Sequence, residues 1–195
     1  MTDDLYRPER LTLRVKHRDL LGTLRQHGVP DEQLPVTAPL CGDLLLSYAF
    51  EQPEHFVMAT PPLLAQAGVS TADIRALALA NFKGRFTAQL VRTGVHDGVF
   101  AVRTGGELEA VLLAFDGFWQ HHVSREIGPV TQVCAPRRDV LLIADPGVPG
   151  ALAALRVEAA RVFHASTDAH ALSLQCMQWA PAGWQLAQLA TEAVA

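Results

Sequence analysis

The sequence is poor in cysteine and has no long uninterrupted hydrophobic run, and each shortage excludes a class of protein. Its three cysteines, Cys41, Cys134 and Cys176, are far apart and lack CxxC spacing, so neither a disulfide framework nor a zinc knuckle is indicated. No apolar run approaches the roughly 18 residues of a spanning helix, and the start, MTDDLYRPER, has no signal-peptide core. We therefore expect a cytoplasmic protein whose cysteines are inert core residues in a reducing compartment.

Charge is also scarce, and it is weakly acidic. Lys and Arg total 16 against 20 Asp and Glu, which gives a net charge of -4. Such a chain has no general attraction to nucleic acid or to anionic lipid, so we expect neither as a partner. Hydrophobic residues make up 49% of the 195 residues and charged residues 18%. This composition and length predict one folded domain, residues 1–195.

Sequence motifs for common enzyme chemistries are missing as well. The chain contains no GxSxG nucleophile motif, no GxGxxG or GxxxxGK phosphate loop and no HExxH zinc motif. We therefore predict no catalytic residue, no metal ligand and no cofactor.

Alternating and continuous apolar segments predict strands, and amphipathic segments with capping residues predict helices. The expected strands are 11–16, 42–52, 55–60, two within 89–104, 130–136, 138–145, 171–179 and 184–189. The expected helices are 17–28, 61–67, 71–83, 107–115, 118–126 and 150–164. Residues 30–40, which carry three prolines, are expected to be a connector. Hairpins dominate this order, so we predict an α+β fold with a mainly antiparallel or mixed sheet and five or six helices packed on it.

The segment FWQHHVSRE (118–126) places two histidines beside a tryptophan. Adjacent side chains diverge by about 100° on a helix, so His121 and His122 cannot readily bind one metal ion. His122 and Glu126 have the i, i+4 spacing of two ligands, but no third ligand is near. We expect an amphipathic helix that is anchored by Phe118, Trp119 and Val123, with both histidines at its rim.

Residues 60–85 resemble a helix-turn-helix, with Gly68 ending the first helix and Ser70 preceding the second. Asp73 lies early in the second helix, where base contacts concentrate, and its carboxylate would repel phosphate. DNA binding through this segment is therefore kept only as an alternative.

The stretch from Pro39 to Phe82 resembles the YtpQ-like family of uncharacterised bacterial proteins. The resemblance rests on a strand with a DLxxxY-type run, a Gly-Val-Ser step and a helix ending in AxxN. The matching residues are Asp43, Leu44, Tyr48, Gly68, Val69, Ser70, Ala78 and Asn81. Phe82 departs from the family's Leu. Pro136, Arg138 and Asp139 match a family turn, and residues 171–186 resemble a terminal strand pair. The resemblance covers roughly residues 34–187, leaves 1–33 as the least similar part, and implies a fold without an activity.

The resemblance draws attention to four polar positions, Asp43, Asn81, Arg138 and Asp139. Asn81 either binds loop backbone at a helix end or orders a functional loop. Arg138 and Asp139 either brace a tight turn or form a site in which Arg138 binds a carboxylate or phosphate.

We therefore predict first a non-enzymatic cytoplasmic module, an adaptor or immunity-type inhibitor, whose partner is another protein. The alternative is a hydrolase or small-ligand-binding protein with a site assembled from these four distant residues. A contiguous apolar surface would favour the first prediction, and a shared pocket would favour the second.

Overall fold

The smaller of two antiparallel sheets is built by the N-terminal third of the chain. The computed structural model describes residues 5–85, 87–106, 108–165, 168 and 170–187. In this part of the chain, β3 (Leu44–Glu51) lies at the centre of the smaller sheet. It pairs with β1 (Leu11–His17) on one side, and with β2 (Thr37–Cys41) and β4 (Phe56–Met58) on the other. The N-terminal strand is thus part of this sheet.

Strand β2 was not predicted, because residues 30–40 were expected to be a connector. This prediction was wrong: Thr37 and Ala38 pair with Ser47 and Leu46 of β3. Pro39 lacks an N–H, which is tolerated in an edge strand, and the pairing shifts register between Pro39 and Cys41. A proline therefore marks this strand as an edge strand.

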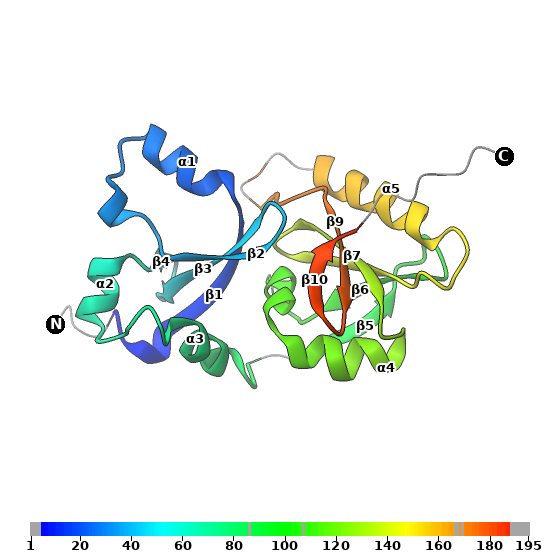
Figure 1. The fold of residues 1–195 in the computed structure, drawn as a ribbon, viewed down its shortest axis with the longest axis horizontal. Helices are drawn as coiled ribbons and strands as arrows, with labels where there is room; N and C mark the ends of the chain where they lie inside the picture. The colour runs from blue at the N-terminus through cyan, green and yellow to red at the C-terminus, as the bar shows by residue number, and fades with distance from the viewer. Residues whose placement is uncertain (1–4, 86, 107, 166–167, 169, 188–195) are drawn as a thin grey trace.

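The larger sheet has the strand order β10-β9-β7-β8-β6-β5, and every neighbouring pair is antiparallel. Its strands are β5 (Gln89–Arg92), β6 (Val99–Arg103), β7 (Thr131–Arg137), β8 (Val140–Ala144), β9 (Cys176–Ala180) and β10 (Gly183–Leu186). All six were expected from hairpin patterns, although residues 188–189 of the last expected strand lie outside the described residues. Figure 1 shows the two sheets side by side.

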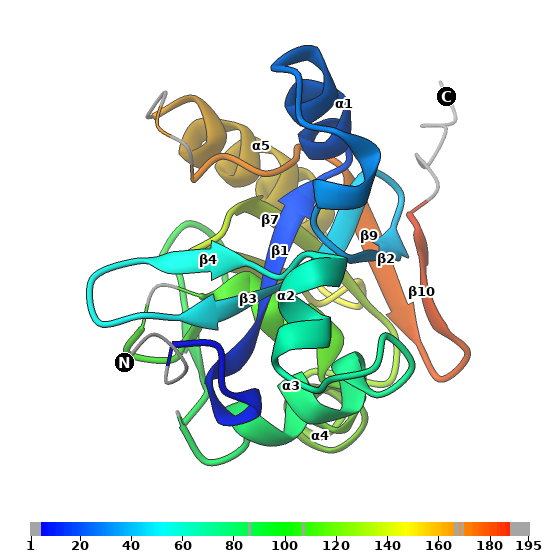
Figure 2. The same ribbon diagram turned by 90° about the vertical axis from the view of Figure 1, so that its left-hand side faces the viewer.

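Helices cover the outer surfaces of both sheets (Figures 1 and 2). The α-helices are α1 (Asp19–Gln26), α2 (Pro61–Gln66), α3 (Ile74–Phe82), α4 (Ser124–Glu126) and α5 (Ala151–His164). Short 3-10 turns are η1 (Pro8–Arg10) and η2 (Asp31–Gln33). Helix α3 packs on β1, and α5 packs on β7, β8 and β6.

The segment 107–115, expected to be a helix, is a 3-10 helix, η3 (Glu109–Ala114), and all six of its residues are buried. The backbone of η3 is held by hydrogen bonds from other segments of the chain. The indole N–H of Trp119 donates to the Leu112 carbonyl at 2.8 Å, and that of Trp184 donates to the Leu113 carbonyl at 2.9 Å. The Ala110 N–H donates to the carbonyl of Arg138. Because these partners come from other segments, local propensity could not indicate the helix type.

One hydrophobic core joins the two sheets. It contains Leu13 and Leu46 of the smaller sheet, Val133 and Ile143 of the larger sheet, and η3. A second cluster lies between the larger sheet and α5, around Leu155. The molecule is thus a single α+β domain with helices packed on two antiparallel sheets, which confirms the predicted fold class.

We expect the Trp119→Phe substitution to lower the free energy of unfolding by about 2 to 4 kcal/mol. The Trp119 side chain is 0% exposed, so the smaller phenylalanine ring leaves a cavity in its place. The buried Leu112 carbonyl also loses its indole donor. Urea unfolding measures the loss. Trp184→Phe removes the same kind of bond from a less buried ring, so a smaller loss is expected. If both variants unfold like the wild-type protein, the indole bonds do not hold η3.

Candidate functional site

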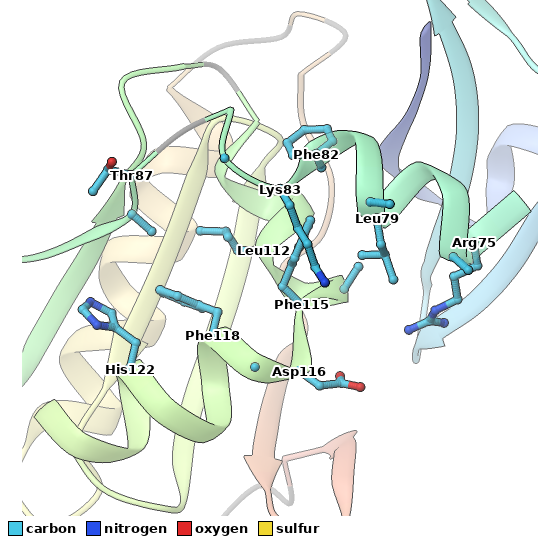
Figure 3. A pocket seen from close by; sticks show the side chains of 16 residues that line it. Arg75, Leu79, Phe82, Lys83, Thr87, Leu112, Phe115, Asp116, Phe118 and His122 are labelled. Carbon is cyan, nitrogen blue, oxygen red and sulfur yellow. The ribbon is translucent and has the colours of Figure 1, made fainter. Parts of the chain in front are cut away.

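A groove of about 830 Å³ lies between α3 and the helical residues 116–126. Figure 3 shows the labelled side chains that line it, with α3 along one wall and the chain around Phe118 along the other. We call residues 116–126 the aromatic helix and this hollow the aromatic groove. Lys83, Gly84, Thr87 and Ala88, together with the end of η3, complete the lining.

Aromatic and aliphatic side chains make up much of the groove's lining. The Phe82 and Phe115 rings lie 5.8 Å apart, and the Phe118 ring lies 5.5 Å from the His122 ring. Leu79 and Leu112 add aliphatic surface between them. Concave, largely apolar surfaces with a few polar groups are the usual form of binding sites.

Charged side chains lie at the rim of the aromatic groove. Arg75 and Lys83 come from α3 and its end, and Asp116 comes from the start of the aromatic helix (Figure 3). Two permanent cations thus face one carboxylate, in a chain whose net charge is -4. The rim favours a ligand that carries negative charge beside its apolar surface.

The aromatic helix has a widened, π-helical turn, η4 (Phe118–Val123), before α4. Trp119 and Val123 are buried in the core, whereas Phe118 and His122 line the groove. The prediction of an anchored amphipathic helix is confirmed, with Trp119 as the anchor. The prediction that Phe118 is an anchor was incomplete, because this ring faces the groove.

Asn81, one of the four predicted site residues, ties α3 to the N-terminal segment. Its side-chain amide donates to the Pro8 carbonyl at 2.7 Å and to the Leu11 carbonyl at 3.0 Å. This agrees with the first of the two interpretations, in which the amide binds backbone. The backbone that it binds belongs to the start of β1, far away in sequence, and not to the adjacent loop.

Asp43 belongs to a polar joint between the two sheets. Its Oδ2 accepts a hydrogen bond from the Ser173 hydroxyl at 2.8 Å and lies 3.4 Å from Nε2 of His17. The Gln175 side chain accepts from the Asp43 N–H and donates to the Cys41 carbonyl. The carboxylate lies between serine and histidine, and serine hydrolysis needs the histidine in that central position. The geometry therefore fits a structural joint.

Arg138 and Asp139 do not form the predicted pair. Nε of the neighbouring Arg137 lies 3.3 Å from Asp139, and its Nη2 lies 2.9 Å from Asp168. The turn is therefore braced by an Arg-Asp pair, as expected, but by the arginine before the predicted one. The Arg138 carbonyl accepts a hydrogen bond from the Ala110 N–H, and the Arg138 N–H donates to the His170 carbonyl.

Arg138 lies close to two cations of β1, Arg14 and Lys16. Burial lowers the pKa of Lys16, and the positive charges of Arg138 and Arg14 lower it further. Burial also lowers the pKa of Arg14, against the attraction of Glu51, and Arg138 and Arg85 add to the lowering. Phe56 lies under both β1 cations, 4.8 Å from the Arg14 guanidinium and 5.5 Å from the Lys16 ammonium. We call Arg14, Lys16, Arg85 and Arg138 the cation cluster.

Sequence reasoning missed both the aromatic groove and the cation cluster. The four predicted residues are not among those that line the groove, and only Arg138 belongs to the cation cluster. Alternation along β1 places Arg14 and Lys16 on one face, but nothing local indicates that Arg138, from a distant turn, lies close to them.

Two of the three cysteines that were expected to be inert core residues lie next to one another. Cys134 of β7 and Cys176 of β9 lie directly opposite one another, with their sulfur atoms 2.8 Å apart. Residues 42 positions apart in the sequence could be paired only once the strand register was known.

Within the described residues, no cluster of three or more His, Cys, Asp or Glu side chains could hold a metal ion. No helix in this part of the chain is long and apolar enough to span a bilayer. Comparison of the chain with protein-family models, with curated proteins and with solved structures finds no match. The resemblance to the YtpQ-like family therefore stays a prediction.

We expect Gly42→Ala to destabilise the protein by about 2 to 3 kcal/mol. Gly42 has a φ of 56°, and a Cβ there would overlap the Gln175 amide. Backbone strain accounts for roughly 1 to 2 kcal/mol, and displacement of the Gln175 hydrogen bonds accounts for the rest. Thermal or urea unfolding measures the effect.

Gly28→Ala is the matched control for Gly42→Ala, because Gly28 has a φ of 81° and open space where a methyl group would be added. It should lose only the backbone contribution. In a double-mutant cycle, Gln175→Ala should offset part of the Gly42→Ala loss. Equal losses in the two glycine variants would contradict the proposed contact with Gln175.

Proposed function

We propose that this protein is a non-enzymatic binding module that holds an acidic, amphipathic helix of another protein in the aromatic groove. The observation that carries the proposal is the groove itself, which lies between two helices, has a volume of about 830 Å³ and has a mainly apolar lining. An amphipathic helix laid in an apolar groove is a recurring mode of peptide recognition. The role would be that of an adaptor or an immunity-type inhibitor in the bacterial cytoplasm.

The exposure of the lining supports a protein segment as the partner. Ala76 and Ala80 on α3 are exposed, and Phe115 and Phe118 are half-buried. The small alanine side chains allow a partner's backbone to come close to α3, and the phenylalanine rings supply the aromatic surface that is enriched at interfaces. Arg75 and Lys83 at the rim would pair with carboxylates on the partner helix.

We expect Phe118→Asp to weaken the binding of groove-selected peptides at least about thirtyfold, the loss typical of a central interface residue. The peptides would be selected from a helical library on the immobilised wild-type protein, and affinities would be measured by fluorescence anisotropy. Selected peptides should carry apolar residues at i, i+3 or i+4, and i+7, with Asp or Glu beside them.

Two further variants distinguish a loss of peptide binding from a loss of folding. Lys83→Glu changes an exposed side chain and should weaken the same acidic peptides. Val157→Asp is the control, because Val157 is 69% exposed on α5, at the opposite side of the molecule from α3 and α4 in both views (Figures 1 and 2). Equal weakening by the Val157 and Phe118 variants, or selected peptides without an acidic bias, would contradict the proposal.

A second candidate function is binding of a phosphate or carboxylate ligand by the cation cluster. The specific observation is the lowered pKa of both Lys16 and Arg14, partly caused by the charge of Arg138. Glu51 already pairs with Arg14 and Arg85, and a bound anion would add negative charge beside Lys16; groups with perturbed pKa values are common at functional sites. This keeps the predicted recognition role for Arg138, with β1 residues in place of Asp43, Asn81 and Asp139.

We expect inorganic phosphate to raise the melting temperature by roughly 5 to 10 °C at about a hundredfold excess over its dissociation constant. Chloride at the same ionic strength is the reference. Arg138→Gln and Lys16→Gln should abolish the rise, whereas Arg125→Gln, on α4 and away from the cluster, should retain it. A rise that survives both cluster variants would exclude this site.

The other two alternatives have less support. Hydrolysis would need a nucleophile next to a base, and the contacts of Asp43 do not provide that order. For DNA binding through residues 60–85, the second helix, α3, contributes Leu79 and Phe82 to the apolar lining of the groove. The carboxylate of Asp73, next to the start of α3, accepts a hydrogen bond from the Ser70 hydroxyl.

A further inference from the structure

Cys134 and Cys176 are placed so that their two thiols can react with one another. They are partners in the register of β7 and β9, with their sulfur atoms 2.8 Å apart. Directly opposite residues in antiparallel strands have Cα atoms about 4.5 to 5.5 Å apart, which is within the range that a disulfide spans. A bond between these residues therefore needs no rearrangement of the sheet.

The two thiols differ in their access to solvent and in their surroundings. Cys134 is 0% exposed and packs between the larger sheet and α5 with Leu155 and Ala159. Cys176 is half-buried. A reagent in solution thus meets Cys176 first, and Cys134 lies behind it.

Arg156 of α5 is the charged side chain that acts on this pair. The pKa of Cys176 is lowered to about 7: the hydrogen bond from the Cys134 thiol lowers it most, burial opposes this, and the nearby Arg156 guanidinium adds to the lowering. The hydrogen bond with Cys176 and burial raise the pKa of Cys134. The directions of the two shifts and the greater exposure of Cys176 favour Cys176 as the thiol that ionises.

Cys41, the third cysteine, shows the contrast within the same fold. Burial raises the pKa of its thiol, and the nearby Asp43 carboxylate raises it further. Low-pKa, accessible thiols react with oxidants, and buried thiols of raised pKa do not. The surroundings of Cys176 therefore favour its reaction with oxidants, and Cys134 is positioned to form a bond with it. Cys41 serves as the unreactive thiol for comparison.

We propose that Cys176 and Cys134 form a peroxide-reactive dithiol site, with Cys176 as the attacking thiolate, Cys134 as the resolving thiol and Arg156 as the positioning residue. The Cys176 thiolate attacks a hydroperoxide, and the O–O bond breaks. The sulfur becomes a sulfenic acid, and the leaving alkoxide or hydroxide takes a proton to form an alcohol or water.

The Cys134 sulfur then attacks the Cys176 sulfur, and the S–O bond breaks. The thiol proton of Cys134 and the hydroxyl of the sulfenic acid leave as water, and the disulfide forms. The dithiol thus gives two electrons to the peroxide, which becomes one alcohol and one water, or two waters when the peroxide is hydrogen peroxide. A small dithiol such as dithiothreitol would reverse the oxidation of the cysteines by thiol-disulfide exchange.

The test treats the reduced full-length protein with equimolar hydrogen peroxide and follows its intact mass without reductant. Wild-type protein and Cys41→Ser should each lose the mass of two hydrogen atoms, with Cys134 linked to Cys176 in the peptide map. Cys134→Ser should stop at the sulfenic acid of Cys176, trapped by dimedone. Cys176→Ser should form neither product.

The pH dependence of the peroxide reaction tests the role of Arg156, because a purely structural role would not change it. The wild-type rate of peroxide reaction should rise with pH and level off above a pH of about 7. Arg156→Gln should shift this profile to higher pH and slow the reaction about tenfold near neutral pH, and Arg156→Lys should restore most of the rate. Oxidation of Cys41 as fast as Cys176, or a Cys176→Ser variant that loses thiols like the wild type, would overturn the proposal.

Discussion

The fold depends on one constraint, which is that the polar backbone of η3 lies inside the hydrophobic core and must be hydrogen-bonded there. Indole N–H groups of Trp119 and Trp184 satisfy two of its carbonyls. These tryptophans belong to the aromatic helix and to β10, so the bonds also fix those elements around η3. The rings of the two tryptophans meet edge to face, 4.7 Å apart. The aromatic groove ends on η3, so the core and the candidate site share one support.

Most secondary structure could be predicted from local signals, and the exceptions have a common cause. Strand β3 is a continuous apolar run, and α2 begins with Thr60 and Pro61, so both patterns are local. In β2 and η3 the bonds that decide the structure come from β3, Trp119 and Trp184. The same holds for sites: Cys134 and Cys176 were each correctly placed in a strand, and only the pairing of β7 with β9 shows that they meet.

The candidate sites illustrate how position decides the role of a residue type. Asn81 and Asp43 were singled out by the family resemblance, and both hold the scaffold together through long-range hydrogen bonds. Phe118 was assigned to the core, and it lines the groove. A sequence indicates which residues are unusual, but long-range contacts determine whether they serve structure or binding.

The π-helical turn limits which sequence changes can alter the groove without disturbing the core. Residue 123 faces the core and residue 122 faces the groove, so the phase of the helix assigns each side chain to one surface. Inserting or deleting one residue in this turn would rotate the following helix by about 100° and exchange those surfaces. Substitution at Phe118 or His122 leaves the phase unchanged. The lining of the groove can therefore change by point substitutions, whereas the length of this helix is fixed by the core beneath it.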